Sequence, residues 1–339
     1  MIDGGEQFDV ARAGGERQGL AYEMGIDFRG VVIALSGDYE IPRENLMELE
    51  DQITGMRVLD SAEPVIAHAR LTYLASEEID IGFNPVEREL VLSGPESMFG
   101  NGSALAFIGQ YVSECLRASE SGTLLVHAAA VKSPEHETSH LILGEKGAGK
   151  TTVTLHLCHD HGYHLIGNDQ VFLGVAPDET LVTDGGNAWF NVRETAIVAD
   201  PRLSRLLSIE PSSQPPWNNK VRVDPGSIGI ETTVDRLPLE SIFHIRIDHT
   251  QSEIYVAPWI GVQKNLILHE RFGRHVSAQA TPFQDDRGNY LGSLPLINPS
   301  RTLKARDELV RLAIKTGITE VFAPDSQSVT DFIASQTQK

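Results

Sequence analysis

The sequence is short of cysteine, of long apolar runs and of positive charge. Its 339 residues include two cysteines, Cys115 and Cys158, both inside segments that we predict to be helical. We expect reduced core thiols in a cytoplasmic protein, with no zinc site built from them. The longest apolar stretches, such as Leu124–Val131, fall far short of the ~20 residues that span a bilayer. The acidic start, MIDGGEQFDV, has no apolar signal-peptide core, so we expect no membrane partner.

Acidic residues outnumber basic residues by 47 to 28, which gives a net charge of -19 at pH 7. A field of that sign repels polyanions at long range, so the composition argues against a nucleic-acid partner. Hydrophobic residues make up 41% of the chain and charged residues 22%. These values are typical of a globular protein, and the length is enough for two average domains or one large domain.

Turn signals and short β-like runs alternate through residues 1–100, which predicts a small β-rich N-terminal domain. The clearest pair of strands lies in Ile79–Leu92, with a turn at Asn84-Pro85. Helical spacing over Ser103–Ala118 then leads into a second domain, residues 101–339. Within it, residues 211–219 (PSSQPPWNN) predict an irregular surface loop.

The second domain opens with the pattern of a nucleotide-binding α/β unit. We predict a strand at Leu124–Val131, a strand at His140–Leu143, a glycine-rich loop, a helix at Thr151–Asp160 and a strand at His164–Ile166.

The glycine-rich loop carries the strongest chemical signal in the chain. It matches G-x-x-x-x-G-K-[ST], the phosphate-binding loop, at every specified position. Glycines let successive backbone amides turn toward phosphate oxygens, the lysine reaches the β- and γ-phosphates, and the threonine hydroxyl binds Mg²⁺. The predicted nucleotide-binding residues are Gly144, Glu145, Lys146, Gly147, Ala148, Gly149, Lys150, Thr151 and Thr152.

We expect ATP to be the nucleotide, with Mg²⁺ as the metal. GTPases usually read the base with an Asn-Lys-x-Asp element. The Asn-Lys pair of this chain, Asn219-Lys220, continues with Val221 and Arg222 instead.

Three segments, LLVHAAAV, LILGEKGAGKTT and HGYHLIGNDQVFL, together resemble the catalytic domain of HPr kinase/phosphorylase and its relatives. The resemblance covers about 50 residues around the loop, with matching spacing. It implies an α/β fold with a P-loop domain of the HPr kinase/PEP carboxykinase type, and a kinase that phosphorylates a hydroxyl. It also leaves assembly into a homo-oligomer open.

The resemblance assigns roles to individual residues. His127 matches a family histidine near the phosphates, and Asp169 matches one of two adjacent acids that supply the general base or a Mg²⁺ ligand. The other acid is replaced by Asn168, which cannot accept a proton at neutral pH. Thr152 stands where the family usually has an acid after the loop. The HPr-capture motif is not recognisable, so we do not expect HPr as the substrate.

Other cations are candidates for substrate binding. Arg193 follows an aromatic and glycine-rich stretch, and Lys220 and Arg222 alternate on one predicted strand face. A solvated strand edge explains the last two equally well. A cluster of Arg271, Phe272 and Arg274 is a further alternative. The histidines from 156 to 164 look metal-like, but their helical spacing does not assure a third ligand.

The leading hypothesis is transfer of the γ-phosphoryl group from ATP to a hydroxyl of a peptide, protein or small metabolite. Lys150 and the loop amides stabilise charge, and Asp169 orients or deprotonates the acceptor. Two alternatives stay open: a nucleotide-dependent switch that transfers nothing, which the loss of one acid favours, and an ATPase.

Overall fold

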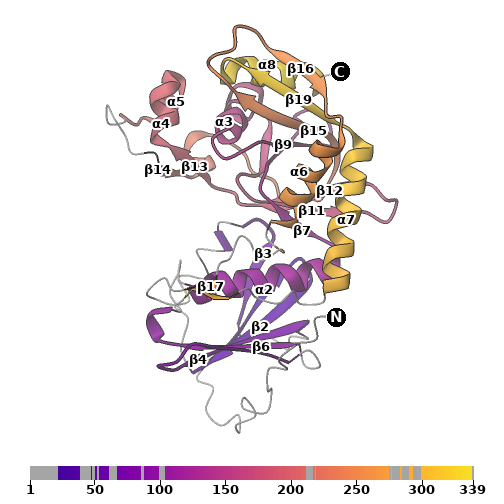
Figure 1. Cartoon of the computed structure of the whole chain (residues 1–339). Coiled ribbons are helices and arrows are strands. Elements are labelled where there is room, and N and C mark those ends of the chain that lie inside the picture. Colours follow the sequence, from indigo (N-terminus) through magenta and orange to yellow (C-terminus); the bar gives the residue numbers. More distant parts are fainter. Residues whose placement is uncertain are drawn as a thin grey trace. The chain divides into compact units, whose positions relative to one another are not determined.

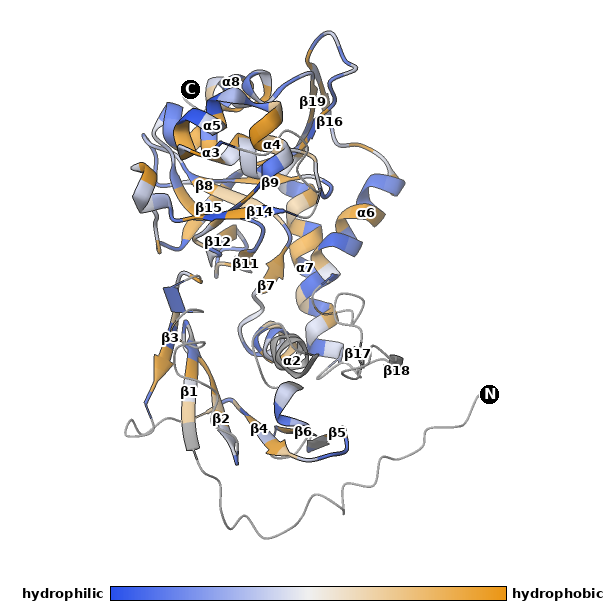
Figure 2. Ribbon diagram, turned by 90° about the vertical axis from the view of Figure 1, so that its left-hand side faces the viewer, coloured by the Kyte–Doolittle hydropathy of each residue, from blue (hydrophilic) through white to orange (hydrophobic). Residues whose placement is uncertain are grey.

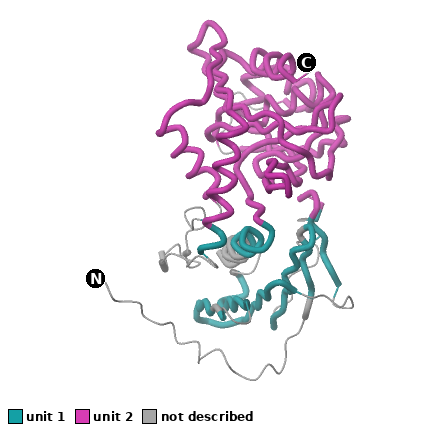
Figure 3. The backbone as a smooth tube through the Cα atoms, turned by 90° about the vertical axis from the view of Figure 1, so that its right-hand side faces the viewer, with its two compact units in different colours: residues 1–50, 56–121, 275–302 teal, residues 51–55, 122–274, 303–339 magenta. Residues whose placement is uncertain are grey.

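The computed structural model shows a mixed α/β protein whose chain divides into two compact units. The structure describes residues 22–38, 47, 50–51, 53–60, 67–84, 88–98, 104–210, 217, 219–274, 276, 283–284, 290–292 and 299–337. Unit 1 comprises residues 1–50, 56–121 and 275–302, and unit 2 comprises residues 51–55, 122–274 and 303–339 (Figure 3). Helix α7 (Pro299–Thr316) begins in unit 1 and continues in unit 2.

Unit 1 is built on a six-stranded mixed sheet (Figure 1). The strand order is β3-β1-β2-β4-β6-β5, in which the β2–β4 and β4–β6 pairs are parallel. A two-residue turn with φ of 48° at Arg29 and 89° at Gly30 joins β1 to β2, as expected for a tight hairpin. The strands are β1 (Tyr22–Phe28), β2 (Val31–Gly37), β3 (Met56–Leu59), β4 (Ala69–Ala75), β5 (Asp80–Asn84) and β6 (Glu89–Gly94).

The predicted boundary at residue 100 differs from the division of the structure. Helix α2 (Ala104–Ser121) packs against β2 and belongs to unit 1, together with the 3₁₀ helix η2 (Glu96–Met98) and the hairpin of β17 (Phe283–Gln284) and β18 (Tyr290–Gly292). An ion pair of 2.6 Å joins Arg88, the residue before β6, to Glu120 in the last turn of α2. Helical spacing in the sequence identifies α2 but does not say which sheet it covers.

Unit 2 contains a nine-stranded mixed sheet. Its main path is β10-β8-β9-β15-β12-β11-β7, and β19 extends it by pairing with β15 and β16. The β15 strand is parallel to both β9 and β19. The strands are β7 (Leu124–Val126), β8 (Ala129–Lys132), β9 (Ser139–Leu143), β10 (His164–Gly167), β11 (Val171–Val175), β12 (Leu181–Gly186), β15 (Leu237–Ile247), β16 (Tyr255–Pro258) and β19 (Ile318–Ala323).

The remaining elements of unit 2 surround this sheet. Strands β13 (Phe190–Arg193) and β14 (Lys220–Val223) form a separate antiparallel pair. The helices are α3 (Lys150–His161), α4 (Glu194–Ala199), α5 (Pro201–Leu207), α6 (Val262–Gly273) and α8 (Ser326–Thr337), with the 3₁₀ helix η3 at Pro225–Ile228. No described helix is long and apolar enough to cross a membrane.

The structure confirms the predicted helix after the glycine-rich loop and the strands at His140–Leu143 and His164–Ile166. The single strand predicted over Leu124–Val131 is wrong. The chain leaves β7 after Val126 and starts β8 at Ala129, because β7 pairs with β11 whereas β8 pairs with β9 and β10. His127 therefore lies at a break between two strands. Of the loop predicted at residues 211–219, Trp217 and Asn219 are described and the others lie outside the described residues.

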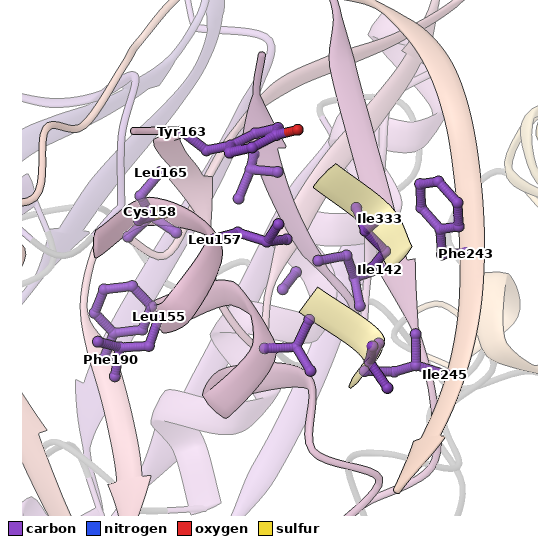
Figure 4. Packing of buried hydrophobic residues seen from close by; sticks show 14 of the residues in the cluster. Ile142, Leu155, Leu157, Cys158, Tyr163, Leu165, Phe190, Phe243, Ile245 and Ile333 are labelled. Carbon is purple, nitrogen blue, oxygen red and sulfur yellow. The ribbon is translucent and has the colours of Figure 1, made fainter. Parts of the chain in front are cut away.

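Helix α3 is buried from Thr152 to Cys158 and forms the centre of the core of unit 2. Side chains of Leu157 on α3, Ile142 on β9 and Ile333 on α8 point toward one another (Figure 4). Phe190 on β13 packs beside Leu155. The strands of this sheet are largely apolar, and α7 presents alternating polar and apolar residues (Figure 2). Cys115 in α2 and Cys158 in α3 are buried, as predicted, and no disulfide joins them.

We predict that truncating the core side of α3 destabilises unit 2. Leu157 is fully buried, so Leu157→Ala leaves a cavity and should lower the free energy of unfolding by roughly 2–5 kcal/mol. Leu266→Ala on α6, where the leucine is 57% exposed, is the control and should change it by less than about 0.5 kcal/mol. Urea denaturation measures both, and equal losses would contradict the central position of α3.

Candidate functional site

The glycine-rich loop lies between the end of β9 and the start of α3, inside unit 2. Gly147 and Gly149 have φ of 88° and 95°, values that side chains rarely tolerate. A Cβ on Gly149 would also collide with the side chain of Ile247 at the end of β15. The backbone amide of Ile247 donates to the carbonyl of Ala148 at 3.1 Å, which fixes the loop against the sheet. The backbone angle therefore favours glycine at both positions, and a side chain at 149 would in addition force Ile247 to move.

The loop leaves backbone donors available to a ligand. Within the described part of the chain, the amides of Lys146, Gly147 and Gly149 have no hydrogen-bond acceptor. All three residues line a cavity of about 830 Å³, a size within the range of ligand pockets. The start of α3, with Thr151 and Thr152, lines it as well. Free amides at the start of a helix bind anions.

Lys150 is buried and donates three hydrogen bonds. Its Nζ lies 2.9 Å from the carbonyl oxygen of Gly144, 3.1 Å from that of Glu145 and 3.2 Å from Nε2 of His127. Burial lowers the pKa of Lys150 to about 8, and the nearby Arg271 lowers it further while Asp169 opposes the change. The ammonium form still predominates at pH 7, since that pH lies below the shifted pKa.

His127 connects Lys150 to the turn after β10. Its Nδ1 lies 3.0 Å from the carbonyl oxygen of Asp169. Because Nε2 accepts from Lys150, the proton of the neutral ring is on Nδ1, which donates to that carbonyl. Burial and the charge of Lys150 lower the pKa of His127 to about 4. Because the ring is neutral at pH 7 and forms a hydrogen bond at each nitrogen, His127 holds Lys150 and the Asp169 turn in position.

The turn after β10 places Asn168 and Asp169 in different environments. Asp169 adopts a φ of 65°, which aspartate and asparagine tolerate better than most residues, and it lines the cavity. Asn168 is fully buried, its Nδ2 lies 3.4 Å from the carbonyl of Trp189, and it does not line the cavity. Asp169 therefore supplies the carboxylate that this pair presents to a ligand.

The predicted substrate cations separate into two groups. Lys220 lies in the cavity with Nζ 3.8 Å from a carboxylate oxygen of Asp169. Arg193 also lines the cavity, and its guanidinium stacks 4.4 Å from the ring centre of Trp217. Arg222 does not line the cavity, since its guanidinium stacks on the ring of Trp189 at 4.1 Å.

The other candidates from the sequence lie in different surroundings. Arg271 forms an ion pair with Glu145 of the loop, Phe272 is buried in the core, and Arg274 lines the cavity. His156 lies between the carboxylates of Asp160 and Asp200. In the described residues no group of histidine, cysteine, aspartate or glutamate is arranged to hold a metal ion by itself.

Sequence reasoning missed the part of the cavity formed by α5 and the start of α8. Asp200 accepts hydrogen bonds there from Arg202, His156 and Ser326. Burial acts to raise the pKa of Asp200, but these hydrogen bonds hold it well below its usual value. The pair Asp200-Pro201 is a helix-start signal in the sequence, and it could have predicted the start of α5.

Comparison with protein-family models and with curated proteins finds no match for this chain.

We predict that His127 is neutral at pH 7 with its proton on Nδ1, and that it titrates near pH 4 in the folded protein. Nitrogen-detected NMR of labelled histidine measures both, and His127→Gln assigns the signal. A ring that titrates near pH 6.5 would contradict the arrangement.

The same shift affects stability in one direction. Unfolded histidine takes up its proton first as the pH falls from about 6.5 to about 4, so the free energy of unfolding decreases across this window. His140 and His244, whose pKa values burial also lowers to about 4, add to the effect. His127→Gln should reduce the dependence without removing it.

Proposed function

We propose that this protein is an ATP-dependent kinase that transfers the γ-phosphoryl group to a hydroxyl acceptor. The observation that carries the proposal is the convergence of Lys150, His127 and the Asp169 turn beside the glycine-rich loop in one cavity. These residues come from three chain segments that are distant in the sequence. Together with the resemblance of the sequence, the arrangement supports a P-loop domain of the HPr kinase/PEP carboxykinase type.

The charge of the cavity supports an anionic ligand. Six basic side chains line it against three carboxylates, although the whole chain carries a net charge of -19. One of those carboxylates, Asp200, is already bound by Arg202 and Ser326. A local excess of positive charge on an acidic protein favours a polyanion such as a nucleoside triphosphate.

The residues that line the cavity beside the glycine-rich loop could hold Mg²⁺. Thr151 offers a hydroxyl and Asp169 a carboxylate, both oxygen donors facing the same cavity. Mg²⁺ binds one or two protein oxygens together with phosphate oxygens and water. When bound, the ion would neutralise charge on the phosphates.

In the proposed reaction the acceptor hydroxyl attacks the γ-phosphorus. A new O–P bond forms, the bond from the γ-phosphorus to the bridging oxygen breaks, and ADP leaves with the bonding electrons. The proton of the hydroxyl passes to the carboxylate of Asp169. Lys150 and the loop amides stabilise the charge on the phosphoryl oxygens, while His127 holds Lys150 and the Asp169 turn in place.

The acceptor is a hydroxyl of a peptide, a protein or a small molecule. Lys220 lies beside Asp169, and Arg193 pairs with Lys220 across β13 and β14, so both cations are available to the acceptor. The acidic composition argues against nucleic acid as a partner. A nucleotide switch without transfer is the second candidate, because Asn168 stands where the resemblance expects an acid and leaves Asp169 as the one carboxylate of the pair. Incubation with γ-labelled ATP, Mg²⁺ and a panel of hydroxy metabolites and serine peptides separates the two.

We predict that Lys150→Ala reduces phosphoryl transfer by at least about 100-fold, since the γ-phosphate loses its buried cation. Transfer of label from γ-labelled ATP measures this. Lys315→Ala, at an exposed lysine in the last turn of α7, is the matched control and should retain full activity. Undiminished transfer in Lys150→Ala would refute the proposed mechanism.

Asp169→Asn distinguishes a general base from a metal ligand. Asparagine keeps the shape and tolerates the same positive φ, so the turn should persist. We predict a fall in kcat of about 100-fold or more with nucleotide affinity within about threefold of the wild type. Asp178→Asn, in an exposed turn, is the control. Parallel losses in rate and in Mg²⁺-dependent affinity would assign Asp169 to the metal instead.

A further inference from the structure

The cavity has lining residues beyond those of the glycine-rich loop that the proposed mechanism does not use. They are Thr195 and Ala199 of α4 together with Asp325, Ser326 and Gln327 at the start of α8, and we call this group the second end of the cavity. Ala199 is exposed and small, so its side of α4 offers an open face rather than a filled one. This end lies entirely within unit 2.

A saturated carboxylate makes the wall of this end rigid. Oδ2 of Asp200 lies 2.9 Å from Nε2 of His156, 2.9 Å from Oγ of Ser326 and 3.1 Å from Nη2 of Arg202. Its other oxygen accepts from the backbone amide of Arg202 at 3.0 Å. With its oxygens occupied, Asp200 holds α3, α5 and α8 together and leaves ligand contacts to its neighbours.

The second end lies one helical turn from the phosphate loop. Thr152 lines the cavity at the start of α3, and His156, four residues later on the same side of the helix, reaches the wall through Asp200. Four residues advance an α-helix by about 6 Å. The carboxylate of Asp200, which lines the cavity, therefore lies about one helical turn from the start of α3, within reach of a ligand whose phosphates lie on the loop.

We propose that this end of the cavity binds the nucleoside half of the nucleotide, an inference that rests on the proposed kinase function. Transfer requires the γ-phosphate to face Asp169, so the nucleoside must point away from Asp169. Ala199 leaves space for a flat base against α4. Oδ1 of Asp325 accepts from the amide of Ser328 at 2.7 Å, whereas its Oδ2 has no partner among the described residues. That oxygen accepts a ribose hydroxyl, a role that acidic residues also have in dinucleotide-binding folds.

The test compares two ligands that share the phosphates. Isothermal titration calorimetry of the full chain measures the affinity for Mg²⁺-ATP and for inorganic tripolyphosphate, which has no nucleoside. Ala199→Phe should weaken ATP binding by about tenfold or more by filling the base site, and should leave tripolyphosphate affinity unchanged. Val198→Phe is the matched control, because Val198 is 47% exposed on the same helix and does not line the cavity.

The outcomes separate this inference from the proposed function. If wild-type protein binds neither ligand, the nucleotide-dependent function fails and the inference fails with it. If ATP affinity survives Ala199→Phe, or if both ligands are weakened equally, the nucleoside assignment is overturned while nucleotide binding stands.

A second variant tests the ribose contact without disturbing the fold. Asp325→Asn keeps an acceptor for the amide of Ser328 at the start of α8. It should weaken ATP binding by about threefold to tenfold and leave the affinity for 2′,3′-dideoxy-ATP unchanged. An equal effect on both nucleotides would overturn the role of Asp325.

Discussion

A lysine ammonium that is 5% exposed needs a hydrogen-bond partner for each of its three protons. Lys150 finds them in the carbonyls of Gly144 and Glu145 and in Nε2 of His127. The two carbonyls reach the ammonium because the loop folds back over the start of α3. His127 reaches it because the chain breaks between β7 and β8, where this histidine lies. The geometry of the site therefore follows from keeping one buried charge solvated by the protein.

The same requirement fixes the protonation of His127. A protonated ring would place a second positive charge 3.2 Å from the ammonium and would lose its acceptor for Lys150. The neutral ring instead donates a hydrogen bond from Nδ1 to the carbonyl of Asp169, which links the position of the Asp169 turn to that of Lys150. The carboxylate of Asp169 is thereby held at the cavity by backbone geometry, with Lys220 as its charged neighbour at 3.8 Å.

The sequence predicted this centre better than its surroundings, and the reason is physical. The loop, α3 and the adjacent strands are local features set by glycine positions and apolar spacing, so a pattern of about 30 residues defines them. The break at His127 depends on which strands pair with β7 and β8, and pairing is decided by segments far along the chain. The contact between Asp200 and Ser326 joins residues 126 positions apart, and no local signal records it.

The helix that carries Lys150 also carries the core of unit 2. Residues from Thr152 to Cys158 are buried against the sheet on one side and against α8 and β13 on the others. Such a helix cannot rotate or slide without breaking the packing of Leu155 and Leu157, so its first turn is a rigid support for the proposed phosphate site.

Charge acts on a different length scale from this packing. The acidic surface repels a nucleotide from afar, but salt limits that repulsion to a Debye length of about 8 Å at physiological ionic strength. Inside the cavity, Lys146 and Lys150 would contact the proposed nucleotide in a less polar medium, where attraction is stronger. Mg²⁺ bound to the nucleotide further reduces the charge that has to approach the surface. An acidic protein can therefore hold a polyanion, provided that the cations are gathered in one cavity.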